Sequence, residues 1–463
     1  MVRSCRFLLG LIVAVGFTVA ANQVRANDPL VVHEWGTFTS LQNNSGTPLG
    51  GINIDDEPLP KFVHNLNPFI LIQPHSVSRY MSKGAPERHP FVTLRLETPV
   101  IYFHPPKSMV KPFTLDVDVA MKGGWLTEFY PQAQPEAPGL KEGRFDFGPI
   151  TRQTVGRLGW HGLTVGTTQS GPDTAANVWL APRSVDAASV KAVGGEAEKY
   201  LFYRGVGNFS APLSVSTNQI HDRLRIQGRF DEVLGSRDTA KIGRIWLVHV
   251  RKDGTSAFRS IGPVTVSDDN GQTVAEMRAS FGEKEYSLGN LASLCDELHA
   301  GLVKDGLYSD EATALVETWR HAYFKSAGLR VFFLVPRVWT DHYLPLKISA
   351  PAEIARVMVG RIELISPDQR ELLEKLSNMP ISNPEWMSNI QSSENGDKFF
   401  SGHSDFGDLG VKIPDDYQTY LDLGRFRNAL VLEQQRRQPT DSLAKFINSY
   451  ELQSFDIPKS LGD

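Results

Sequence analysis

The sequence predicts an α+β fold, with a β-rich, sandwich-like and mainly antiparallel region over residues 27–286 and a helical, α+β region over residues 287–463. In the first region, short runs of apolar, aromatic and β-branched residues recur between Gly, Pro, Asn and Asp, a pattern typical of strands joined by turns. Near Leu288 the spacing of the apolar residues changes from about two to about 3.6, which indicates helices.

The strand-like runs of the first region all have the length and composition of half-buried or buried strands. They are residues 30–41, 91–103, 113–120, 162–166, 177–181, 199–205, 223–228, 242–251 and 258–267.

The second region predicts several helices and two further strands. Apolar residues follow helical spacing over 291–303 and over 310–325, where Ser309 is the predicted N-cap. Strands are predicted at 329–336 and 356–365, a capping-box helix from Ser366 to about residue 377, a long polar loop over 378–415, and helices over 416–437 (interrupted near Gly424) and 443–450.

The first 26 residues have the layout of a secretory signal peptide. Arg3 and Arg6 form a basic start, residues 7–21 form an apolar run, and small residues at Val24 and Ala26 fit a cleavage site. The run is short compared with the roughly 20 residues of a membrane-spanning helix. We therefore expect cleavage after Ala26, no transmembrane anchor afterwards, and a soluble protein that is periplasmic or secreted.

The charge and cysteine content of the mature chain limit the kinds of partner and the source of stability that we expect. The leader holds three of the 48 Lys and Arg and none of the 52 Asp and Glu, so the mature chain carries 45 basic and 52 acidic side chains, a net charge of −7. This acidity argues against a nucleic-acid partner, whose phosphates require a basic surface. Cleavage leaves Cys295 as the single cysteine, so the mature chain has no intramolecular disulfide and depends on its core for stability.

Two histidines are candidate ligands of a divalent metal ion. His33 lies on the first predicted strand and His104 at the end of another. If the two strands are neighbours, alternation along each strand brings His33, Tyr102 and His104 together, and imidazoles with a carboxylate suit Zn²⁺ or a similar ion. The alternative is that each histidine is an ordinary hydrogen-bonded residue of the sheet.

Two glutamates are candidate catalytic acids. Glu34 follows His33, and Glu97 belongs to the predicted strand that carries His104. The pair His33-Glu34 is the start of a His-Glu-x-x-His zinc motif, but residue 37 is Thr and the segment reads as a strand, so this motif is absent.

An aromatic segment suggests a different site. Trp125, Glu128 and Tyr130 lie close together in the sequence. A carbohydrate site typically combines an aromatic ring with a carboxylate. The ring packs on the apolar face of the sugar, and the polar groups form hydrogen bonds with the sugar hydroxyls. The alternative is that these rings belong to the core of a sandwich.

Four phrases resemble those of uncharacterised exported bacterial proteins. They are His-Glu-Trp-Gly-Thr-Phe at 33–38, Glu-Thr-Pro-Val-Ile-Tyr-Phe-His at 97–104, Tyr-Leu-Phe-Tyr-Arg-Gly-Val-Gly at 200–207 and Arg-Val-Met-Val-Gly-Arg-Ile-Glu-Leu at 356–364. The resemblance spans most of the mature chain. It implies export and no particular reaction, and it assigns no functional residue.

The sequence thus supports two main hypotheses. The first is an exported, soluble binding or interaction protein of the bacterial envelope that recognises glycan or protein. The second is an extracytoplasmic hydrolase acting on polysaccharide or peptide, in which His33 and His104 hold a metal ion and Glu34 or Glu97 supplies the acid. A purely structural envelope component is a third, simpler interpretation.

Overall fold

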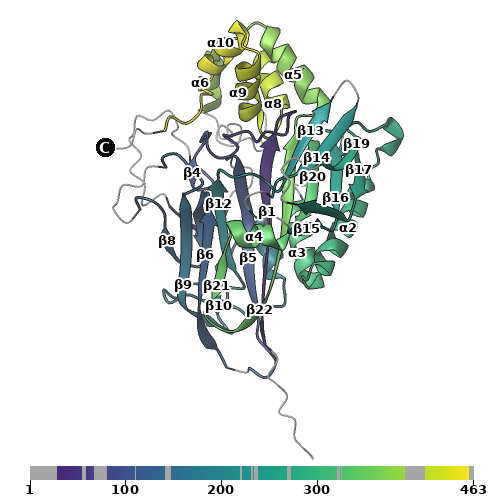
Figure 1. The fold of residues 1–463 in the computed structure, drawn as a ribbon. Helices are drawn as coiled ribbons and strands as arrows, with labels where there is room; N and C mark the ends of the chain where they lie inside the picture. The colour runs from purple at the N-terminus through teal and green to yellow at the C-terminus, as the bar shows by residue number, and fades with distance from the viewer. Residues whose placement is uncertain are drawn as a thin grey trace, which may run out of the picture.

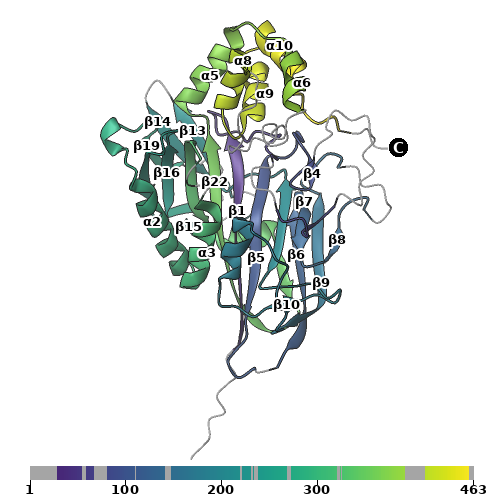
Figure 2. The same ribbon diagram turned by 180° about the vertical axis from the view of Figure 1, so that it is seen from behind.

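A large sheet dominates the molecule (Figures 1 and 2). The computed structural model describes residues 29–54, 59–66, 81–109, 111–140, 147–218, 222–230, 233, 238–267, 273–320, 324, 326–391 and 412–457. In spatial order the sheet contains β11 (Ala197–Glu198), β10 (Val190–Lys191), β9 (Val155–Val165), β7 (Gly124–Tyr130), β12 (Leu201–Gly207), β5 (Leu94–His104), β1 (Leu30–Gln42), β22 (Ala352–Leu364), β20 (Gly328–Val335), β16 (Ile245–Val250) and β17 (Ser256–Ile261).

Shorter strands extend or accompany this sheet. β6 (Phe113–Lys122) pairs with β9 and with β21 (Leu346–Ile348), β8 (Gln134–Glu136) pairs with β9, and β2 (His64–Asn65) pairs with β7. Separate small sheets are formed by β13 (Leu213–Asn218), β14 (Arg223–Gly228) and β19 (Thr273–Arg278), by β15 (Thr239–Ile242) and β18 (Val264–Ser267), and by β3 (Met81–Ser82) and β4 (Ala85–Pro86).

Strand β1 lies at the centre of the main sheet and is paired on both edges. It runs parallel to β22, with Leu30 opposite Ala352 and Gln42 opposite Leu364. It runs antiparallel to β5, with His33 opposite Tyr102. Its near-continuous run of apolar and β-branched residues suits a strand that is buried on both faces.

The β1–β5 pairing contains an irregularity at Gly36. The register shifts between Trp35 and Thr37 of β1, and on β5 Thr98 takes a left-handed conformation with φ of 42°. A Cβ added at Gly36 would lie 2.8 Å from the Cα of Pro99, so only glycine allows the two backbones to approach this closely.

Three helices cover one face of the main sheet. They are α1 (Asn177–Arg183), α2 (Asn290–Lys304) and α3 (Ser309–Trp319), which pack against one another and against the sheet. Their buried side chains, such as Trp179, Leu298 and Trp319, join Trp35 of β1 and Trp246 of β16 in one apolar cluster.

The other face of the sheet belongs to a second, larger apolar cluster, in which Phe38 of β1 meets Trp339 of the short helix α4 (Arg337–Tyr343). The C-terminal helices gather beyond one end of the main sheet (Figure 1) and contribute to the same cluster. They are α5 (Pro367–Asn378), α6 (Met387–Gln391), α8 (Asp415–Asp422), α9 (Arg427–Arg437) and α10 (Asp441–Ser449), and short 3₁₀ turns occur at Glu283–Glu285 and Pro384–Trp386.

Most of the predicted elements are confirmed, and several details were wrong. The loop predicted over 378–415 contains a 3₁₀ turn and helix α6, and the strand predicted over 258–267 is divided between β17 and β18, which belong to different sheets. Residues 177–181 were expected as a strand but lie in α1, because a short Val-Trp-Leu run fits a buried helix face as well as a strand. Ser309 is the first residue of α3 rather than its cap, which is Tyr308. The capping box of α5 is present: the Ser366 hydroxyl accepts from the Gln369 N–H at 3.2 Å.

The β-rich and mainly antiparallel character of the fold is confirmed, whereas a separate sandwich is not. The sheet also crosses the boundary predicted between residues 286 and 287, since β20 and β22 lie beside β1. The predicted leader, and residues 392–411 of the loop predicted over 378–415, lie outside the described residues. Within the part of the chain that the structure describes, no helix is long and apolar enough to cross a bilayer.

The close approach at Gly36 generates a stability prediction. Gly36→Ala should lower the free energy of unfolding by about 2 kcal/mol, because the added methyl overpacks the β1–β5 crossing. Gly243→Ala is the matched control: nothing lies within 4 Å of its added Cβ, so it should change stability by less than about 1 kcal/mol. Urea unfolding of both variants measures the difference, and equal effects would refute the steric argument.

Candidate metal centre

His33 and His104 come together because β1 and β5 are neighbours. Val31 of β1 lies opposite His104 and His33 lies opposite Tyr102 in the antiparallel register. Residues two apart along a strand share a face, so both imidazoles project to the same side of the sheet. Their ring centroids are 5.1 Å apart, as expected if the two strands pair.

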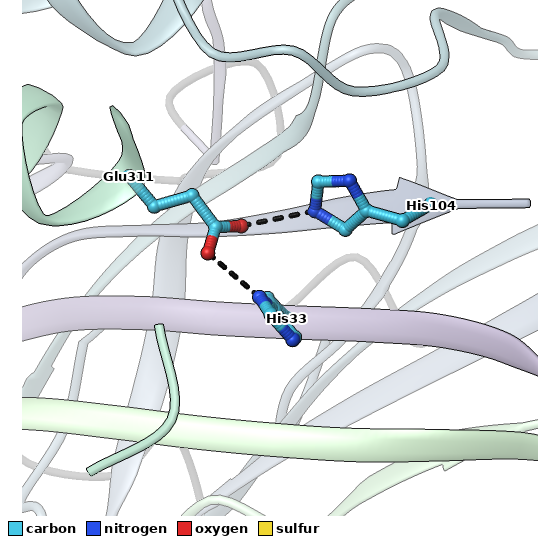
Figure 3. A group of neighbouring side chains, drawn as sticks. All are labelled: His33, His104 and Glu311. Atoms are coloured by element: carbon cyan, nitrogen blue, oxygen red, sulfur yellow. Dashed lines mark hydrogen bonds and ion pairs between the residues drawn. The ribbon is translucent and has the colours of Figure 1, made fainter. Parts of the chain in front are cut away.

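Glu311 completes the group from helix α3. Its Oε2 accepts a hydrogen bond from His33 Nδ1 at 2.6 Å, and its Oε1 accepts one from His104 Nε2 at 3.0 Å (Figure 3). The backbone N–H of Tyr308 donates to the same Oε2 at 2.8 Å. Glu311 is the third residue of the helix, where a carboxylate commonly reaches back to the N-cap backbone.

This carboxylate is inaccessible to water. The side chain of Glu311 is 0% exposed, against 4% for His33 and 11% for His104. Burial by itself raises the pKa of Glu311, but the hydrogen bonds from His104 and His33 outweigh it, and the pKa lies below its usual range. The group is therefore an ionised carboxylate held between two imidazole rings.

The ring of Tyr308 forms one wall of the site. Its centroid is 4.5 Å from that of His33 and 4.8 Å from that of His104. The residue is 45% exposed, so it separates the two imidazoles from solvent on that side.

The donor atoms have the chemistry of a metal site. One ligand-type atom from each of His33, His104 and Glu311 lies within 4.8 Å of the others, and no other such group of His, Cys, Asp or Glu occurs among the described residues. Tetrahedral Zn²⁺ with bonds of about 2.0–2.2 Å requires donors roughly 3.3 Å apart. The distances from the Glu311 oxygens to His33 Nδ1 and His104 Nε2, 2.6 and 3.0 Å, are close to this spacing.

Glu34 does not join this group, because it lies on the opposite face of β1. Its carboxylate accepts hydrogen bonds from the Tyr203 hydroxyl at 2.6 Å and from Arg356 Nε at 2.5 Å. Arg356 also donates to Asp341 at 2.8 Å. The catalytic role of Glu34 stays a prediction, with its carboxylate in a buried ion pair.

Glu97 lies elsewhere along β5, opposite Thr37. Its buried carboxylate is 3.0 Å from the ammonium of Lys83 and accepts from Arg95 Nε at 2.8 Å. Burial raises the pKa of Glu97, but the charges of Arg95, Lys83 and Arg204 outweigh this, and the pKa lies far below its usual range. The structure therefore does not bring Glu97 to the imidazoles, and its catalytic role also stays a prediction.

The aromatic set lies on β7. Trp125 and Tyr130 are each only 2% exposed and pack edge-on against Phe147 and Trp179. Glu128 lies between them in sequence, 3.6 Å from Arg204. The two rings thus offer no open face on which a sugar would stack, and their ligand-binding role stays a prediction.

Comparisons with known proteins do not assign a family to this chain. No family model and no curated protein matches the chain. The Fcho1 Mu homology domain of Danio rerio with bound Eps15 peptide is similar with a TM-score of 0.27 and 8% identity, over 73% of this chain and 97% of that one. The yeast delta-COP-I mu-homology domain complexed with a Dsl1 WxWxV peptide has a TM-score of 0.20 and 8% identity, over 74% and 98%. At these scores neither comparison carries an argument about fold or function.

The surroundings of Glu97 generate a pH-dependent prediction. Glu97→Gln leaves Lys83 and Arg95 without their buried counter-charge and should cost about 3 kcal/mol at neutral pH. Because the folded-state pKa of Glu97 is depressed, this contribution is complete above the unfolded value near 4.3 and is lost as the pH falls further.

Urea unfolding of the wild type and the variant, at pH 7 and again near pH 3, measures this loss. Glu276→Gln is the control, because its ion pair with Arg225 is exposed and should contribute less than about 1 kcal/mol. A gap between wild type and Glu97→Gln that does not narrow in acid would contradict the charge assignment.

Proposed function

We propose that this protein is an exported binding protein that holds a divalent metal ion, with Zn²⁺ the first candidate, at His33, His104 and Glu311. The single observation that carries the proposal is the approach of these three donors, from three separate elements, to within 4.8 Å of one another. Two imidazoles and a carboxylate are a donor set that Zn²⁺ uses in proteins.

A bound dication would balance the charge of this group. With both imidazoles neutral, the buried Glu311 carboxylate leaves one negative charge inside the protein, and its backbone partner, the Tyr308 N–H, is uncharged. A buried charge is costly unless it is compensated. A dication does this directly. The competing interpretation is a protonated imidazole, in which case the three residues only fasten α3 to the sheet.

Export is the second half of the proposal. It rests on the basic start, the apolar run and the small residues at the N-terminus, together with the resemblance of four phrases to exported bacterial proteins. We place the mature protein in the periplasm or outside the cell, where its partner would be a glycan or a protein of the envelope.

One observation favours a second function, a metal-dependent hydrolase. Two histidines and a glutamate with a further open position form the zinc set of some metalloproteases. In that case the acid or base would have to be a group other than Glu34 and Glu97, because both carboxylates are in buried ion pairs.

Metal content tests the first half of the proposal. Protein of residues 27–463, purified from periplasm without chelator, should contain about one divalent ion per chain, and His33→Ala/His104→Ala should lose it. His161→Ala is the matched control, because His161 pairs with Asp118 on an exposed part of β9. Metal-free wild type that also takes up no Zn²⁺ on titration would refute the proposal.

N-terminal sequencing of the expressed full-length chain tests the second half. The mature protein should begin at Asn27, and replacing Arg3 and Arg6 by Glu should leave uncleaved precursor in the cytoplasm. A chain that retains its first 26 residues in the membrane fraction would show an anchor instead.

A further inference from the structure

The metal centre has fewer protein donors than a zinc ion usually takes. His33, His104 and Glu311 supply three, whereas structural zinc sites are almost always closed by four protein ligands. Among the described residues no fourth His, Cys, Asp or Glu reaches the group. The neighbouring Asp310 is already engaged, since its carboxylate accepts from the backbone N–H of Asp186 at 2.8 Å and of Glu311 at 3.0 Å.

The three donors differ in their exposure to solvent. Glu311 is fully buried and His33 nearly so, while His104 is the most exposed of the three donors. The ring of Tyr308 lies against both imidazoles, and this residue is 45% exposed. A further donor from solution would therefore reach the centre beside Tyr308.

The net charge of the centre with a bound dication determines which charge a further ligand should carry. A dication with one carboxylate and two neutral imidazoles has a net charge of +1. The N-terminus of α3 adds a partial positive charge, whereas the nearby Asp310 carboxylate disfavours a second negative charge. A monoanion balances the site, and oxygen is a donor that zinc accepts beside nitrogen.

We infer that the ion at this centre keeps an exchangeable position beside Tyr308, and that this position takes a carboxylate oxygen of a ligand from solution. The inference rests on the proposed function, and it defines the ligand as an acidic one, such as the carboxylate of a peptide or of an acidic sugar. Tyr308 covers the position without ligating the ion.

Cobalt provides the readout, because Co²⁺ replaces Zn²⁺ in such sites and, unlike Zn²⁺, absorbs visible light according to its ligands. The Co²⁺-loaded protein of residues 27–463 is titrated with acetate, and with inorganic phosphate in parallel. Acetate should shift the visible band saturably with one acetate per ion, and phosphate should bind more weakly. Tyr308→Phe should have the same spectrum as wild type before acetate is added and the same acetate response.

Each other outcome would overturn the inference. A protein that binds Co²⁺ but whose spectrum ignores acetate has a closed site, and the proposed function would still stand. A changed starting spectrum in Tyr308→Phe would make the Tyr308 hydroxyl the fourth ligand. Tighter binding of phosphate than of acetate would refute the carboxylate assignment. Failure to bind any metal would overturn the proposed function together with the inference.

Discussion

The pairing of β1 on both edges is the constraint on which the rest of the structure depends. Twelve of the 13 residues of this strand are buried, with apolar clusters on both of its faces. A polar side chain on such a strand must find a partner inside the protein. Glu34 finds Arg356 and Tyr203 on one face, and His33 finds Glu311 on the other. The ion pair and the candidate metal centre thus follow from the same burial.

Local structure was largely predictable, because it depends on neighbouring residues. The Ser366 capping box marks the start of α5, and alternating or continuous apolar runs mark β1, β5 and β14. The order of strands was not predictable in this way. Nothing in either segment alone says that β22 lies parallel to β1, since that choice is made by packing across the whole sheet.

In the candidate site, too, local features were predictable from the sequence and contacts between distant segments were not. Strand alternation correctly placed His33 and His104 on one face once β1 and β5 were paired, but the sequence could only state this as a condition. Glu311 was missed because it is 278 residues from His33. The one local signal for Glu311 is its place as the third residue of α3. Predicting Ser309 as the N-cap hides this signal, because it shifts the start of the helix by one residue. Glu97 was a candidate catalytic acid because the sequence alone does not reveal its ion pairs. In the structure, Lys83 and Arg95 neutralise its carboxylate.

The parallel pairing of β1 with β22 also bears on how such a chain matures. Leu30 pairs with Ala352, so an element near the start of the chain is completed by one that lies more than 300 residues later. A polypeptide that is synthesised from its N-terminus presents β1 and β5 long before β22. Until then one long apolar edge of β1 has no partner, and unpaired edges of this kind attract other chains. The fold therefore leaves the central strand exposed on one edge during synthesis, until the chain has been made as far as Leu364.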